Sequence, residues 1–164
     1  MKNLAIGIDP GVNTGIATWH TEERQFLAID TMSIHEAMNV VRALQNKIAE
    51  VIVEDARKAT YGRHTMLDAA ARQGAGSIKR DCKIWDDYLL YMGVPYRMFR
   101  PDKTRNSYAS WKKGSKLSKA QKEVILTRWR KMTGWKRRCS EHARVASMLV
   151  LDYKPNTRII YQNA

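Results

Sequence analysis

The chain has 164 residues, and its 44% hydrophobic and 27% charged residues are typical of a globular protein with a packed core. These proportions exclude collagen, coiled coils and intrinsic disorder, and no apolar run approaches the ~20 residues of a membrane span. We therefore expect one domain over residues 1–164 and no contact with a membrane. The start lacks a signal-peptide pattern, and two cysteines make no disulfide framework, which predicts a cytoplasmic location.

One segment carries the whole formal net charge of +13. Fifteen basic and two acidic residues lie between Arg97 and Arg138, whereas the rest of the chain holds fourteen of each sign. A neutral body with a cationic segment indicates a protein that binds a polyanion. The alternatives are a merely basic surface and a membrane-binding surface, and Pro101, Gly114 and Gly134 weigh against the second by interrupting any long amphipathic face.

The N-terminal third predicts three strands and a helix. Residues 3–8 form an apolar run that ends in the turn residues Asp9-Pro10-Gly11. Two further strands, over 14–19 and 25–30, are separated by a polar segment that favours a hairpin. Ser33 and Glu36 then have the spacing of a capping box, and apolar residues at helical intervals predict a helix over 34–49.

The rest of the chain alternates strands and helices. We expect strands at 51–53 and 95–99, helices at 65–92, 119–132 and 141–152, and a loop insertion near 101–117. The order β-β-β-α-β-α-β-α-α predicts an α/β fold. Its mixed five-stranded sheet would open with an antiparallel meander and be flanked by α-helices.

Two carboxylates stand at the ends of predicted strands. Asp9 follows the first apolar run, and Glu54 follows Val51-Ile52-Val53. If these strands are parallel neighbours, both carboxylates emerge at one sheet edge, where a hard divalent cation would relieve their repulsion. Asp9 taken alone could equally be a turn residue. Asp55 is the second choice, because strand alternation points it to the opposite face.

The string Ile6-Gly7-Ile8-Asp9-Pro10-Gly11, with Thr14-Gly15, resembles the opening of RuvC-type Holliday junction resolvases, and the Glu54 strand end resembles their second acidic motif. The resemblance covers most of the chain and looks most like the phage-encoded branch. It implies a ribonuclease H-like fold and an endonuclease that cuts Holliday junctions or other branched DNA. It also implies two Mg²⁺ or Mn²⁺ ions, with Asp9 and Glu54 as ligands and no nucleotide cofactor.

The third motif of these resolvases begins the last helix with Asp or His, two residues, then Asp. His142 fits the first position, and Val145 stands where the second carboxylate is expected. Either Glu141, beside His142, is a substitute ligand, or two carboxylates and a histidine suffice, or activity is impaired. A register one residue earlier would align Glu141 and Arg144 instead. Capping a turn and contacting DNA are the other roles open to His142.

Basic and aromatic residues flank the predicted site. The loop after Glu54 mixes cations with Tyr61, which suits phosphate contact together with stacking on an unpaired base. In the resembled family this loop helps to open the junction centre. The predicted DNA-binding residues are Arg57, Lys58, Tyr61, Arg63, Lys103, Arg105, Lys112, Lys113, Lys116 and Lys119. Further cations at Arg128, Arg130, Lys131 and Lys136–Arg138 lead to the third motif.

The long helix over 65–92 is predicted to pack in the core, and the resemblance adds that it forms the interface of a homodimer, with two sites for the two strands of a junction. Two other functions compete with a nuclease. A sugar-kinase or actin-type ATPase uses a similar turn after its first strand, but needs two domains. A catalytically weak or inactive junction-binding protein on the same fold is suggested by Val145.

Overall fold

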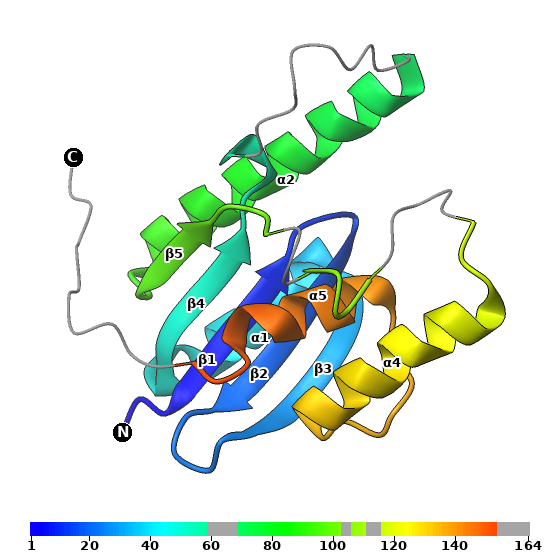
Figure 1. Ribbon diagram of the computed structural model, residues 1–164. Helices are drawn as coiled ribbons and strands as arrows, with labels where there is room; N and C mark the ends of the chain where they lie inside the picture. Colours follow the sequence, from blue (N-terminus) through cyan, green and yellow to red (C-terminus); the bar gives the residue numbers. More distant parts are fainter. Residues whose placement is uncertain (59–68, 103–105, 111–115, 154–164) are drawn as a thin grey trace.

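The computed structural model describes residues 1–58, 69–102, 106–110 and 116–153 (Figure 1). Its N-terminal part contains β1 (Leu4–Asp9), β2 (Asn13–His20), β3 (Gln25–Ser33), α1 (Ile34–Leu44), η1 (Gln45–Lys47), β4 (Ile48–Glu54) and η2 (Ala56–Lys58). Its C-terminal part contains α2 (Ala69–Met92), β5 (Tyr96–Phe99), α4 (Lys119–Thr133) and α5 (Glu141–Val150). The predicted order of strands and helices is confirmed.

The five strands form one mixed sheet in the order β3-β2-β1-β4-β5. β1, β2 and β3 are an antiparallel meander, whereas β4 runs parallel to β1 and β5 runs parallel to β4. The two parallel connections pass through helices, as parallel neighbours require. The C-terminal ends of β1, β4 and β5 therefore meet at one edge of the sheet.

Alternating residues of the central strands face two separate layers of helices. Ala5 and Ile52 pack with α5 and with Trp129 of α4, whereas Ile6 and Val51 pack with α1 and α2. The result is a three-layer α/β/α arrangement, with α5 lying across one face of the sheet and α1 across the other (Figure 1). The period of two along each strand decides which layer a side chain meets.

Local capping explains where three helices begin. Ser33 and Ser118 each form a complete capping box, with Glu36 and Gln121 respectively, and Ser140 accepts a hydrogen bond from the backbone N–H of Ala143. Gly134 ends α4 in the left-handed conformation, at φ 69°. These caps agree with the predicted starts at residues 34, 119 and 141.

Several predicted boundaries are wrong; β3, for example, ends at Ser33 instead of residue 30. The helix predicted over 34–49 ends at Leu44, and Ile48 instead begins β4, where it is fully buried and pairs with Leu4. Ile48 continues the helical spacing of the preceding apolar residues, but an apolar residue at that position fits a strand equally well. The last helix ends at Val150 instead of residue 152, because Leu151 leaves the helical conformation with a ψ of 126°, and Asp152 follows with a positive φ of 56°. Residues 65–68 of the helix predicted over 65–92 lie outside the described residues.

Candidate active site

Register and alternation bring Asp9 and Glu54 to one edge and one face of the sheet. Ile8 pairs with Val53 across the parallel β1 and β4, so the next residues of the two strands, Asp9 and Glu54, emerge side by side. Because Ala5 and Ile52 face α5, Asp9 and Glu54 share that face by the period of two. This is the arrangement that the sequence predicted if β1 and β4 were parallel neighbours.

Two glycines let α5 lie directly on the sheet. A Cβ at Gly15 would come within 2.1 Å of the carbonyl oxygen of His142, and one at Gly7 within 2.1 Å of that of Ala146. Both neighbours are backbone atoms, so no side-chain rotation relieves the overlap. The glycine that closes the Asp9-to-Gly15 turn thus sets how closely the start of α5 approaches β1 and β2.

This close approach places His142 on Asp9. His142 Nδ1 lies 2.8 Å from Asp9 Oδ2, although the residues are 133 positions apart in the sequence. The side chain of Asp9 is 15% exposed and that of His142 is 51% exposed, so the pair opens to solvent. The hydrogen bond to Asp9 raises the pKa of His142; burial lowers it, and the charges of Asp9 and Glu141 raise it further.

Asn106 is a residue of the site that the sequence prediction missed. Its Nδ2 donates a hydrogen bond to Glu54 Oε1 at 2.8 Å, which fixes that carboxylate from the side of the 106–110 turn. Its Oδ1 is buried and accepts no hydrogen bond from any residue that the structure describes. The sequence signal was weak, because Asn106 lies in a basic loop and is 52 positions from Glu54.

Arg144 ties the Asn106 turn to α5. Its side chain is buried at 6% exposure, and its Nε donates to the carbonyl oxygen of Ala109 at 2.7 Å. Its Nη1 donates to the carbonyl oxygen of Cys139 at 3.0 Å. The turn that holds Glu54 and the helix that holds His142 are therefore anchored to each other by one guanidinium.

Val145 and Glu141 flank the His142–Asp9 pair on α5. Val145 is 6% exposed and belongs to the apolar layer between α5 and the sheet, so it supplies no polar atom. Glu141 is partly buried and lines a hollow between α4 and α5. Its charge raises the pKa of His142.

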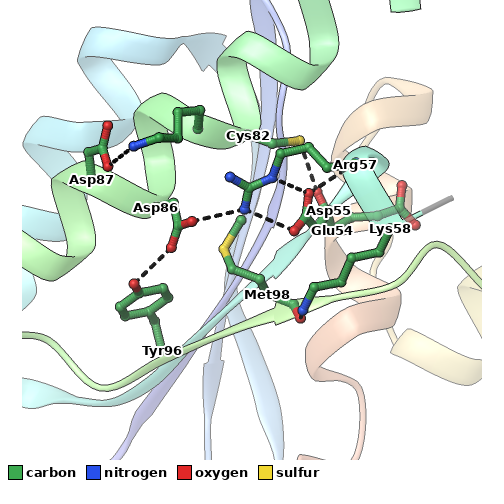
Figure 2. A network of polar contacts seen from close by, with 10 residues as sticks. Glu54, Asp55, Arg57, Lys58, Cys82, Asp86, Asp87, Tyr96 and Met98 are labelled. Carbon is green, nitrogen blue, oxygen red and sulfur yellow. Dashed lines mark hydrogen bonds and ion pairs between the residues drawn. The ribbon is translucent and has the colours of Figure 1, made fainter. Parts of the chain in front are cut away.

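Asp55 points to the opposite face, as strand alternation predicted. It is 1% exposed and accepts two hydrogen bonds from the guanidinium of Arg57, at 2.8 Å from Nε and 2.9 Å from Nη2, and a third from the backbone N–H of Arg57 at 3.1 Å (Figure 2). Arg57 Nη2 also contacts Asp86 of α2 at 2.9 Å, and Asp86 accepts a hydrogen bond from Tyr96 of β5. Burial raises the pKa of Asp55, but the hydrogen bonds and charge of Arg57 outweigh it and hold the pKa below its usual value. This network fixes the chain immediately after Glu54.

The predicted DNA-binding residues fall into three groups. Arg57 has Nε and Nη2 engaged in this network, an arrangement that favours a positioning role over the predicted phosphate contact. The Nζ of Lys58 contacts the carbonyl oxygen of Met98 at 2.6 Å, and Lys116 and Lys119 are exposed. The predictions for Tyr61, Arg63, Lys103, Arg105, Lys112 and Lys113 lie outside the described residues.

The donor chemistry of this edge suits a hard divalent cation. Two carboxylates and an imidazole lie at this edge, carried by β1, β4 and α5, and the amide of Asn106 adds a buried neutral oxygen next to Glu54. In the ranges that the structure describes, however, no three His, Cys, Asp or Glu side chains are grouped closely enough to hold an ion. His142 Nδ1 and Asp9 Oδ2 are hydrogen-bonded to each other, and both are atoms that a bound ion would use as ligands.

Comparison with known proteins identifies the fold. The solved structure of T. thermophilus RuvC in complex with a Holliday junction substrate is similar to this chain, with a TM-score of 0.56. The sequence identity is 17%, and the match covers 91% of each chain. No family model and no curated protein matches the sequence.

The chain therefore has the ribonuclease H-like α/β fold seen in RuvC, which confirms the predicted fold class. None of the helices in the described ranges is both long enough and apolar enough to cross a membrane.

Proposed function

We propose that this chain is a metal-dependent endonuclease that cuts Holliday junctions or other branched DNA by phosphodiester hydrolysis. The observation that carries the proposal is the meeting of His142 and Asp9 at the sheet edge where Glu54 also emerges. A RuvC structure with a similar fold is bound to a Holliday junction substrate, which supports branched DNA as the partner. The net charge of +13 supports a polyanionic substrate of this kind.

Asp9, Glu54 and His142 would hold two Mg²⁺ or Mn²⁺ ions, which when bound activate the attacking water and stabilise the leaving oxygen. The chain itself positions these ligands. Asn106 holds one oxygen of Glu54, and the α5 backbone on Gly15 holds the imidazole of His142 against Asp9. Exposed cations, Lys116 and Lys119 among them, would neutralise phosphates around the cut without reading bases.

We further propose a homodimer, because a symmetric junction presents two strands to be cut. The resemblance assigns the interface to the long helix, which is α2 in the structure. Several large apolar side chains of α2 are exposed: Ile78, Ile84, Leu90 and Tyr91. Sedimentation velocity of the free protein tests this assignment, with Leu90→Lys expected to shift a dimer to a monomer.

The test of the proposed activity is cleavage of a labelled synthetic four-way junction with Mg²⁺ and then Mn²⁺. Linear duplex DNA of the same sequence and the Asp9→Asn variant are the controls. We expect paired symmetric nicks in the junction, loss of those nicks in Asp9→Asn, and retention of junction binding by that variant. Absence of cleavage by the wild type in both metals would contradict the proposed activity.

A second function is favoured by one specific observation. Val145 is buried and apolar where the resembled motif has a carboxylate, which suits a junction-binding protein with weak or absent catalysis. Tight and selective binding of four-way junctions without cleavage in either metal would support this function over the first.

A further inference from the structure

A hollow of about 500 Å³ lies between α4 and the segment that leads into α5. Its lining includes Arg130 and Trp129 of α4, the consecutive Lys136, Arg137 and Arg138, and Glu141 at the start of α5. We call it the α4–α5 hollow. It is separate from the pair His142 and Asp9, but its rim continues directly into the helix that carries His142.

The walls of the α4–α5 hollow are fixed by buried side chains. Trp129 is 1% exposed and donates a hydrogen bond from Nε1 to Ser147 Oγ of α5 at 3.0 Å. Arg144 lines the hollow, is itself more than nine-tenths buried, and holds the carbonyl oxygen of Cys139 at 3.0 Å. These contacts tie α4 and the 136–140 segment to α5, so the rim keeps its place relative to His142.

The rim is strongly cationic. Lys136, Arg137 and Arg138 are exposed, and none of them forms an ion pair with a residue that the structure describes. Arg130 pairs with Glu123, two helical turns earlier on α4, at 2.8 Å. Glu141 is the one acidic side chain of the lining, against five basic ones. Three adjacent free cations around a hollow are suited to phosphate groups.

The distance along the chain limits where those phosphates lie relative to the cut. Arg138 and His142 are four residues apart. An extended chain spans at most about 3.6 Å per residue, so their Cα atoms are no more than about 14 Å apart. The rim therefore lies close along the chain to His142, so phosphates bound there would belong to DNA next to the cut.

We propose that the α4–α5 hollow binds backbone phosphates of one DNA arm, next to the phosphate held at Asp9 and His142. The inference rests on the proposed function, because branched DNA is taken as the substrate. It adds the surface of the protein that holds one arm of this DNA. Such contacts position the DNA and do not read its sequence. They also do not sense the branch, since linear duplex presents the same backbone.

The test compares two triple variants with the wild type. Lys136→Gln/Arg137→Gln/Arg138→Gln removes the rim charges, whereas Lys2→Gln/Arg42→Gln/Lys47→Gln removes three exposed charges near the N-terminus and on α1 and η1, away from the α4–α5 hollow. Junction and linear duplex affinities are measured by fluorescence anisotropy in EDTA at several salt concentrations. Circular dichroism melting confirms that both variants fold like the wild type.

We expect the rim variant to bind both DNAs at least about tenfold more weakly at low salt, with its salt slope smaller by about 2–3 units, near 0.9 for each lost phosphate contact. Phosphate ethylation interference on one arm, next to the cut phosphate, should also be lost in the rim variant. The control variant should lose much less affinity and keep the wild-type slope. A rim variant with an unchanged slope, or a control variant with an equal loss, would overturn the inference while the proposed function stands. A wild type that binds no branched DNA would overturn the proposed function and this inference together.

Discussion

His142 Nδ1 lies 2.8 Å from Asp9 Oδ2, which joins the start of the last helix to the end of the first strand. The contact depends on three features that are separate in the sequence: the strand end at Asp9, the cap at Ser140 and the bare backbone of Gly15. The pKa of His142 therefore reports directly whether the site is assembled.

We expect the pKa of His142 in the metal-free protein to lie above its ordinary value near 6.5, and to fall in Asp9→Asn. Because the folded-state pKa is raised, the stabilisation from this contact is complete below about pH 6.5 and is lost as the pH rises through the raised pKa. NMR titration of the imidazole protons in EDTA measures this, with Asp87→Asn on α2 as the control. Equal His142 pKa values in the wild type and Asp9→Asn would contradict the contact.

Gly15→Ala should disrupt the site without touching any functional side chain. The new Cβ would lie 2.1 Å from the His142 carbonyl oxygen and 2.8 Å from the Ala143 nitrogen, so α5 must move away from the sheet. We expect a loss of about 2–3 kcal/mol in the free energy of unfolding and a fall in the pKa of His142. In Gly11→Ala the nearest atom is 3.6 Å from the new Cβ, so this control should unfold like the wild type in urea.

Asn106 variants test the support of Glu54. Asn106→Ala removes a hydrogen bond to a carboxylate, with an expected cost of about 1.5–3 kcal/mol. Asn106→Asp should be less stable still at pH 7, because two carboxylates would then lie side by side. This additional loss in the free energy of unfolding should decrease toward pH 4, where one of the two carboxylates is protonated. Urea denaturation at both pH values measures the difference, with the exposed Asn39→Ala as control. An Asn106→Asp variant as stable as Asn106→Ala at pH 7 would place the amide away from Glu54.

Arg57→Leu should destabilise the fold through Asp55. Without the guanidinium, a carboxylate that is 1% exposed loses its partner, with an expected cost of about 3 kcal/mol at pH 7. Since the pKa of Asp55 is held low, the contribution of the pair is present above about pH 3.8 and is lost as the pH falls through the lowered pKa.

The difference in melting temperature between the wild type and Arg57→Leu should therefore become smaller at acidic pH, as measured by thermal unfolding. Lys83→Gln, which breaks the exposed ion pair with Asp87, is the control and should cost less than about 1 kcal/mol. A loss no larger than that of the control would show that Asp55 needs no partner.

Val145→Asp tests whether position 145 faces the proposed cation site. Val145 is 6% exposed, so in EDTA the new carboxylate should lower the free energy of unfolding by about 3 kcal/mol. Mg²⁺ should then raise the melting temperature of Val145→Asp more than that of the wild type, because a cation would compensate the buried charge. Val145→Thr, which adds a polar group of the same size without charge, should show no such gain. An equal response to Mg²⁺ in both substitutions would put position 145 outside the site.

Much of the fold followed from local patterns in the sequence. Period-two alternation separates Ala5 from Ile6 and Ile52 from Val51, and so assigns each to its layer. The capping boxes at Ser33 and Ser118 marked helix starts within one residue, because capping is a local interaction. Ile48 was misassigned because a single apolar residue between a helix and a strand satisfies both periods.

The sequence by itself determined that Asp9 and Glu54 end apolar strands and that one cationic segment carries the net charge. Only the tertiary structure decided that His142 reaches Asp9, that Asn106 holds Glu54, and that Arg57 turns to Asp55 and Asp86. The physical reason is the distance along the sequence over which each kind of interaction acts. Periodicity and capping act within a few residues, whereas these contacts depend on strand register and on how closely α5 can approach a sheet that has glycine at positions 7 and 15.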